Sequence, residues 1–119
     1  MSELIIFDKE KGETDSHVFE QMLANELAIF MFSAPWCNPC HRFTPTVSKI
    51  ATQTDDVAFF KVDIEDFQQS AEHFGVTVVP TLMFFYNGKV VHAMQGGNES
   101  KLRAGIGILQ RMKNEKVVV

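Results

Sequence analysis

Apolar residues recur along the chain with two alternating spacings, which predicts strands interleaved with helices. Short apolar or alternating runs predict strands, whereas apolar residues three and four positions apart predict helices. The strand-like runs lie at residues 4–7, 27–32, 57–62, 81–86 and 89–94. The helix-like segments lie at residues 15–25, 37–52, 67–74 and 98–112. Because residues 27–32 are apolar throughout, we expect that strand to be covered on both faces.

The order of these elements, β-α-β-α-β-α-β-β-α, is typical of an α/β fold. We expect strands that a helix separates to run parallel through right-handed crossovers. The turn Asn87-Gly88 instead predicts an antiparallel hairpin. Together these features predict a central mixed sheet of about five strands, flanked by four helices in two layers.

Individual residues refine this prediction. In the first helix, capped by Asp15 or Ser16, we expect four apolar residues on the buried side: Val18, Met22, Phe19 and Leu23. Pro45 should kink the second helix. Gly105 and Gly107 should weaken the last helix, by about 1 kcal/mol each relative to alanine.

The 119 residues and 45 % hydrophobic content are typical of one globular domain, here residues 1–119. A net charge of −4 argues against nucleic-acid binding, which needs a basic surface. The longest apolar run, residues 27–32, is too short to cross a membrane. With no visible targeting segment, we expect a cytoplasmic protein.

The chain has two cysteines, Cys37 and Cys40, three positions apart. In a reducing compartment such a pair more often performs chemistry or binds metal than forms a structural bridge. Cys37 lies at a strand-to-helix turn, where the helix N-terminus favours a thiolate, and Cys40 lies one turn deeper. We therefore expect Cys37 to attack a disulfide and Cys40 to resolve the mixed disulfide. Pro39 suits the first turn, where no backbone donor is needed.

Three other interpretations of the pair remain open. Cys37 to His41 also satisfies the Cys-x-x-Cys-His signature of covalent haem, with His41 as an axial ligand, although such chains are usually exported. A structural zinc site usually needs four ligands, and the chain offers a single cysteine pair. The third interpretation is a redox-inactive binding module, although such a module has no need of two matched cysteines. We expect neither a metal nor a bound cofactor.

Several motifs in order along the chain resemble the thioredoxin family. They are Trp36-Cys37-Asn38-Pro39-Cys40, Lys61-Val62-Asp63, Val79-Pro80-Thr81, Phe84-Phe85-Tyr86-Asn87-Gly88-Lys89 and Gly96. The resemblance covers nearly the whole chain and implies the thioredoxin fold. It also implies the activity of that family, which is the reduction of protein disulfides by dithiol–disulfide exchange.

The resemblance further assigns roles to single residues. It implies that Trp36 forms an apolar contact surface for substrates and that Gly96 lies beside the substrate groove. It implies a cis peptide bond between Val79 and Pro80, which places the Val79 backbone beside Cys37. An extended substrate segment could then pair with that backbone like an added strand.

The resemblance also implies partners. Electrons would come from a thioredoxin reductase that uses NADPH. Client proteins would include peroxiredoxins, reductases of oxidised methionine and ribonucleotide reductase. We expect a monomer that binds neither nucleic acid nor membrane.

The sequence departs from the family pattern at the position where a buried Asp usually serves proton transfer. Here that position is Met31, which cannot carry a proton. Two hypotheses replace the missing group: water reaches Cys40 directly, or His41 acts as the base.

Further positions around the motif also depart from the family pattern or should tune the motif. Ser33 replaces a common Trp, which alters the wall behind the motif without touching its chemistry. Asn38 replaces a Gly, which should shift the reduction potential. Pro39 is retained, which by analogy with the family favours a reductant over a strong oxidant. We expect Lys61 to be a cation that tunes the buried thiols.

Overall fold

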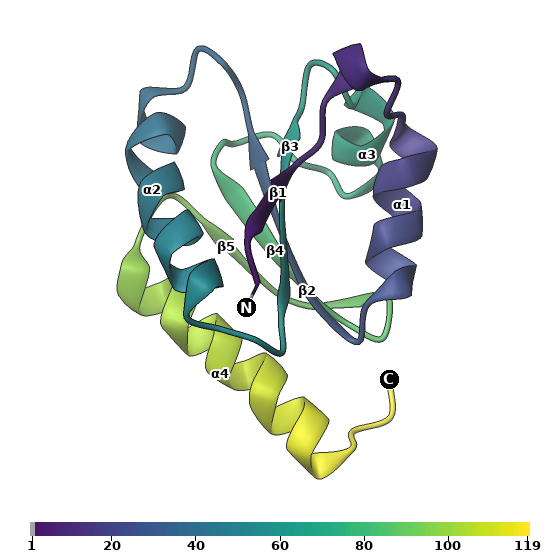
Figure 1. Ribbon diagram of the computed structural model, residues 1–119, viewed down its shortest axis with the longest axis vertical. Helices are drawn as coiled ribbons and strands as arrows, with labels where there is room; N and C mark the ends of the chain where they lie inside the picture. Colours follow the sequence, from purple (N-terminus) through teal and green to yellow (C-terminus); the bar gives the residue numbers. More distant parts are fainter. Residues whose placement is uncertain (1) are drawn as a thin grey trace.

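The structure, a computed structural model, describes residues 2–119 and is built on one five-stranded sheet (Figure 1). The strands are β1 (Leu4–Ile6), β2 (Leu27–Ser33), β3 (Ala58–Asp63), β4 (Thr81–Tyr86) and β5 (Lys89–Gln95). Their order across the sheet is β1-β3-β2-β4-β5. All seven residues of β2 are buried, which confirms the prediction of a strand covered on both faces.

Helices cover both faces of the sheet. They are η1, a short 3-10 turn (Lys9–Lys11), α1 (Asp15–Ala24), α2 (Asn38–Thr52), α3 (Gln68–His73) and α4 (Glu99–Glu115). The helices α2 and α4 lie on one face, and α1 and α3 lie on the other (Figure 1). The fold is the α/β thioredoxin fold expected from the sequence, with a mixed sheet and four α-helices.

The direction of β4 differs from our expectation. β1 and β2 run parallel to β3, but β4 runs antiparallel to β2 although a helix separates it from β3. The reason is the length of α3, whose six residues span about 9 Å, whereas a six-residue strand spans about 20 Å. A helix this short cannot carry the chain back along the sheet, so β4 starts near the end where β3 stops. The hairpin between β4 and β5 is antiparallel as predicted.

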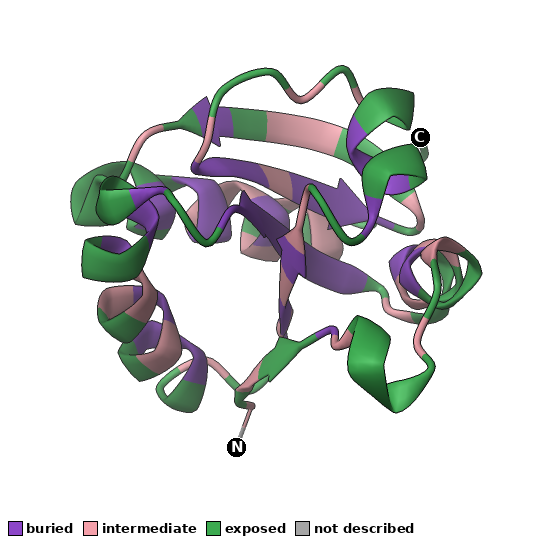
Figure 2. Ribbon diagram, turned by 90° about the horizontal axis from the view of Figure 1, so that it is seen from above, coloured by how far each residue is buried: buried purple, intermediate pink, exposed green. Residues whose placement is uncertain are grey.

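The interior forms two apolar clusters, one on each face of the sheet. Alternate residues of β2 serve them: Ile29 and Met31 pack under α2 and α4, while Phe30 and Phe32 pack under α1 and α3. Buried residues follow the strands and the inward sides of the helices (Figure 2). The cluster that contains Met31 also contains both cysteines.

Four local expectations need correction. Leu23 is 73 % exposed, because it lies at the end of α1, against Gly88 of the hairpin rather than the sheet. The cap of α1 is Thr14, whose side chain and backbone N–H both pair with His17. The final helix continues to Glu115. Gly105 in this helix packs tightly against the buried ring of Phe84, so its role is more than a weakening of the helix.

Candidate active site

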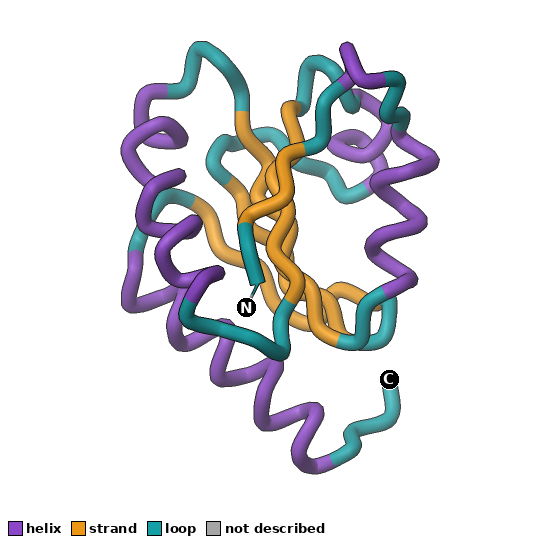
Figure 3. Tube along the Cα trace, in the orientation of Figure 1, coloured by secondary structure: helices purple, strands orange, loops and turns teal. Residues whose placement is uncertain are grey.

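The connection from β2 to α2 carries Cys37, and the first turn of α2 carries Cys40, at the end of the sheet where the loop after β3 also lies (Figure 3). Cys37 is the N-cap of α2, and its backbone N–H donates to the Ala34 carbonyl over 3.1 Å. Pro39 stands in the first turn of the helix, where its missing N–H costs no hydrogen bond. This turn brings the Cα atoms of Cys37 and Cys40 to 5.3 Å, and the two sulfurs form a disulfide.

The two sulfurs have different surroundings. Cys40 is completely buried, whereas Cys37 keeps 4 % of its surface exposed. The Cys37 sulfur accepts the backbone N–H of Cys40 over 3.2 Å and lies at the positive end of the α2 dipole. Both interactions favour negative charge on the Cys37 sulfur, so the outer sulfur is the better site for a thiolate.

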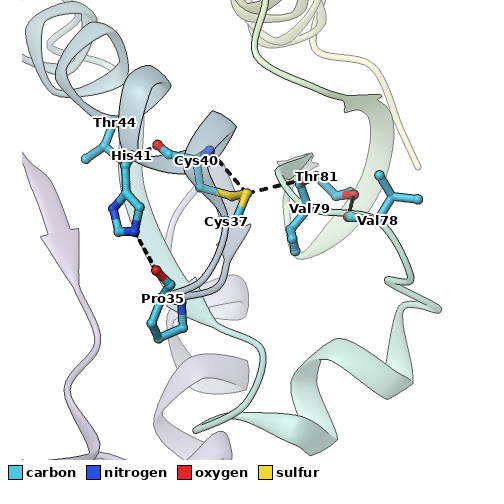
Figure 4. The surroundings of a disulfide bond; sticks show 8 residues. All are labelled: Pro35, Cys37, Cys40, His41, Thr44, Val78, Val79 and Thr81. Atoms are coloured by element: carbon cyan, nitrogen blue, oxygen red, sulfur yellow. Dashed lines mark hydrogen bonds between the residues drawn. A yellow bond between two sulfur atoms is a disulfide. The ribbon is translucent and has the colours of Figure 1, made fainter.

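The loop before β4 forms the other wall of the site. The Val79–Pro80 peptide bond is cis, as the resemblance implied. The Val79 carbonyl oxygen lies 3.7 Å from the Cys37 sulfur (Figure 4). Gly96 has a φ of +82° and donates its backbone N–H to the Pro80 carbonyl over 2.8 Å. These contacts bring residues 37, 79 and 96, which are distant in sequence, to one surface.

Two exposed apolar side chains border the disulfide. Trp36 is 65 % exposed and Val78 is 47 % exposed. The indole Nε1 of Trp36 donates to the Glu65 carboxylate over 3.0 Å, which holds the ring in place. Our sequence analysis missed Val78 and Glu65. Glu65 lies 29 residues from Trp36, and no local pattern could have joined them.

Met31 and Lys61, which the sequence suggested as tuning residues, lie behind the motif. Met31 is completely buried in the cluster of the cysteines, and its Cα pairs in register with that of Lys61 on β3. His41 does not face the sulfurs, because its Nε2 hydrogen-bonds the Pro35 carbonyl over 2.6 Å (Figure 4). Ser33 and Lys61 both line a cleft of about 520 Å³ behind the β2–α2 connection.

A hollow of about 760 Å³ follows β5 and α4, away from the cysteines. It shares only Thr81 with the residues drawn around the disulfide in Figure 4. Within residues 2–119, no three His, Cys, Asp or Glu side chains converge as metal ligands. In the same range no helix combines the length and the apolar character needed to cross a bilayer.

A Cys-x-x-Cys disulfide at a helix N-terminus, with its outer sulfur facing the Val79 carbonyl, is suited to exchange with other disulfides. The fold and the site together define a thiol–disulfide oxidoreductase. Comparison with known proteins identifies the family. The thioredoxin family model matches residues 10–107. Chicken thioredoxin is 37 % identical over 81 residues, which cover 68 % of this chain and 77 % of the chicken protein.

Solved structures agree. Plasmodium falciparum thioredoxin has a TM-score of 0.78 and 26 % identity, covering 90 % of this chain and 97 % of that one. A chain from a study of yeast mitochondrial 1-Cys peroxiredoxin has a TM-score of 0.74 and 26 % identity, and the match covers 77 % of this chain and 87 % of that one. The chain belongs to the thioredoxin family. Its Cys37–Cys40 pair makes it a dithiol–disulfide exchange reductase.

Proposed function

We propose that Cys37 is the attacking thiol in the reduction of protein disulfides. The observation that carries this proposal is the asymmetry of the pair, since Cys37 alone retains exposed surface. In the reduced protein, the Cys37 thiolate attacks one sulfur of a substrate disulfide. A mixed disulfide forms, and the other substrate sulfur leaves as a thiolate that takes up a proton.

Cys40 then completes the reaction. Its sulfur loses a proton and attacks the Cys37 sulfur, which displaces the second substrate thiolate. The products are a substrate with two thiols and the Cys37–Cys40 disulfide, so two electrons pass from the protein to the substrate. Cys37 and Cys40 lie one helical turn apart, so Cys40 can attack the Cys37 sulfur without any unfolding of α2.

We propose that the substrate binds as an extended segment against Val79, with Trp36 as an apolar contact surface. The 3.7 Å contact of the Val79 carbonyl oxygen with the Cys37 sulfur supports this arrangement. Pro80 and Gly96 have a positioning role, because the hydrogen bond between their backbones fixes the loop that presents Val79. The exposed Trp36 ring supplies apolar surface for the partner.

The partners and the setting belong to the same proposal. A thioredoxin reductase that uses NADPH returns the disulfide to the dithiol. Peroxiredoxins are among the substrates, since the similar yeast chain comes from a study of a peroxiredoxin resolved by glutathione and thioredoxin systems. The chain forms one domain in this proposal, which its single five-stranded sheet supports. We further propose that it acts in the cytoplasm as a monomer.

Replacement of each cysteine tests these roles. Cys37→Ser removes the nucleophile and should abolish reduction of insulin disulfides. Cys40→Ser removes the resolving thiol and should trap a one-to-one mixed disulfide at Cys37, detected by mass spectrometry. The double variant, which has no thiol, serves as the control and should trap nothing. If Cys40→Ser turned over normally in a dithiol cycle, the assignment of roles would be wrong.

A further inference from the structure

A small hollow lies beside the cysteine motif, between the first turns of α2 and the loop before α4. Its volume is about 190 Å³, and four residues line it: Pro39, Arg42, Phe43 and Gly97. A β-carbon at Gly97 would lie 2.8 Å from Cγ of Phe43. Since only a glycine permits this approach, the loop and the helix meet closely at the floor of the hollow.

The charged wall of this hollow is a cation without a partner. Arg42 is exposed, and within residues 2–119 its guanidinium forms no ion pair and no hydrogen bond. Arg103, by contrast, pairs with Glu99 over 2.9 Å, while Arg111 near the far end of α4 also forms no ion pair or hydrogen bond within residues 2–119. A guanidinium offers several donors in a plane that matches a carboxylate, so Arg42 can accept an acidic group.

Two lining residues connect this hollow to the active site. Pro39 stands between the two cysteines in the chain, and Gly97 directly follows Gly96, whose backbone N–H binds the Pro80 carbonyl. The hollow therefore adjoins both the cysteine motif and the loop that presents the Val79 carbonyl to the Cys37 sulfur. A substrate segment that binds at the disulfide lies beside Arg42.

We infer that the hollow at Arg42 is a subsite for an acidic side chain, Asp or Glu, close to the target cysteine of a protein substrate. This inference rests on the proposed disulfide reductase function and names a preference among its substrates. Because the pair formed with Arg42 would be exposed to solvent, it should raise kcat/KM by about two- to fivefold. The gain should decline as salt is raised, because screening weakens exposed charges.

Synthetic peptide disulfides provide the test. Two series carry Glu, Gln or Lys, one series with this residue just before the target cysteine and the other just after it. With the wild-type chain at low salt, the Glu peptide of one series should be reduced about two- to fivefold faster than the Lys peptide. The Gln peptide should fall between them.

Two charge reversals locate the effect. Arg42→Glu should reverse the preference in the same series. Arg111→Glu makes the same change in net charge near the far end of α4, about 20 Å along the helix from Asn98, and should preserve the preference. Equal rates for Glu and Lys peptides in both series would overturn the inference, as would an equal effect of both variants. If wild type reduced no peptide at all, the proposed function itself would fail.

Discussion

At the residue scale, the route of the proton taken from Cys40 depends on Met31 and His41. Met31 is fully buried against the cysteines and has no proton to exchange. His41 directs its ring to the Pro35 carbonyl, away from the sulfurs. Of the two hypotheses raised by the sequence, this geometry argues against the histidine base. The water route requires solvent to reach Cys40, which is completely buried in the disulfide form.

His41→Ala tests this choice. Because the ring faces away from Cys40, we expect the variant to keep the pH dependence of disulfide reduction. Its rate should change by no more than about fivefold, the equivalent of one exposed hydrogen bond of about 1 kcal/mol. The measurement is a pH–rate profile of both proteins. A displaced midpoint in the variant would restore His41 as the base.

Residue roles were predictable where local geometry sets them. The spacing of Cys37 and Cys40 fixes their different depths, because three positions on a helix make one turn. The pairing of Trp36 with Glu65 was beyond such reasoning, since it depends on where the loop after β3 lies. Leu23 was misassigned for a related reason: the helical spacing cannot say that the end of α1 faces a hairpin.

At the element scale, the two glycines of α4 have opposite effects on the stability of the fold. A β-carbon at Gly105 would overlap the buried ring of Phe84 on β4. A β-carbon at Gly107 would meet only the guanidinium of Arg111, at 3.6 Å. Gly105 therefore allows α4 to approach the sheet, whereas Gly107 only costs the helix conformational freedom.

Substitution by alanine should separate the two glycines. Gly105→Ala should lower the free energy of unfolding by about 1–3 kcal/mol, because the packed core must shift. Gly107→Ala, its matched control in the same helix, should raise it by up to about 1 kcal/mol. Urea denaturation of both variants measures the difference. Equal effects of the two variants would contradict this account of α4.

The succession of helices and strands followed from the apolar pattern, but the direction of β4 did not. The dipeptide Asn87-Gly88 by itself favours a tight turn between antiparallel strands, so the hairpin could be predicted from two residues. Whether a helix returns the chain along the sheet depends on the length of that helix. The helix expected at residues 67–74 was only one residue longer at each end than α3, and it was already too short for the parallel crossover that we assumed. Element boundaries elsewhere differ by one to three residues, as fraying ends would suggest.

At the scale of the whole molecule, the fold gathers the active site from three separate segments. The β2–α2 connection supplies the disulfide, the loop before β4 supplies Val79, and the loop after β5 supplies Gly96. Periodicity could not have joined these segments, and the family resemblance alone implied their meeting. The resulting surface presents the Val79 backbone beside the Cys37 sulfur, which suits the pairing with a protein segment that we propose.

The central claim is that Cys37 and Cys40 exchange two electrons as one unit. A redox titration of the full chain in graded glutathione buffers, followed by alkylation and mass spectrometry, tests it most directly. We expect a single transition between a chain with two alkylated cysteines and a chain with an intramolecular disulfide and none. A titration in which the two sulfurs never join, and only glutathione adducts accumulate, would contradict the account.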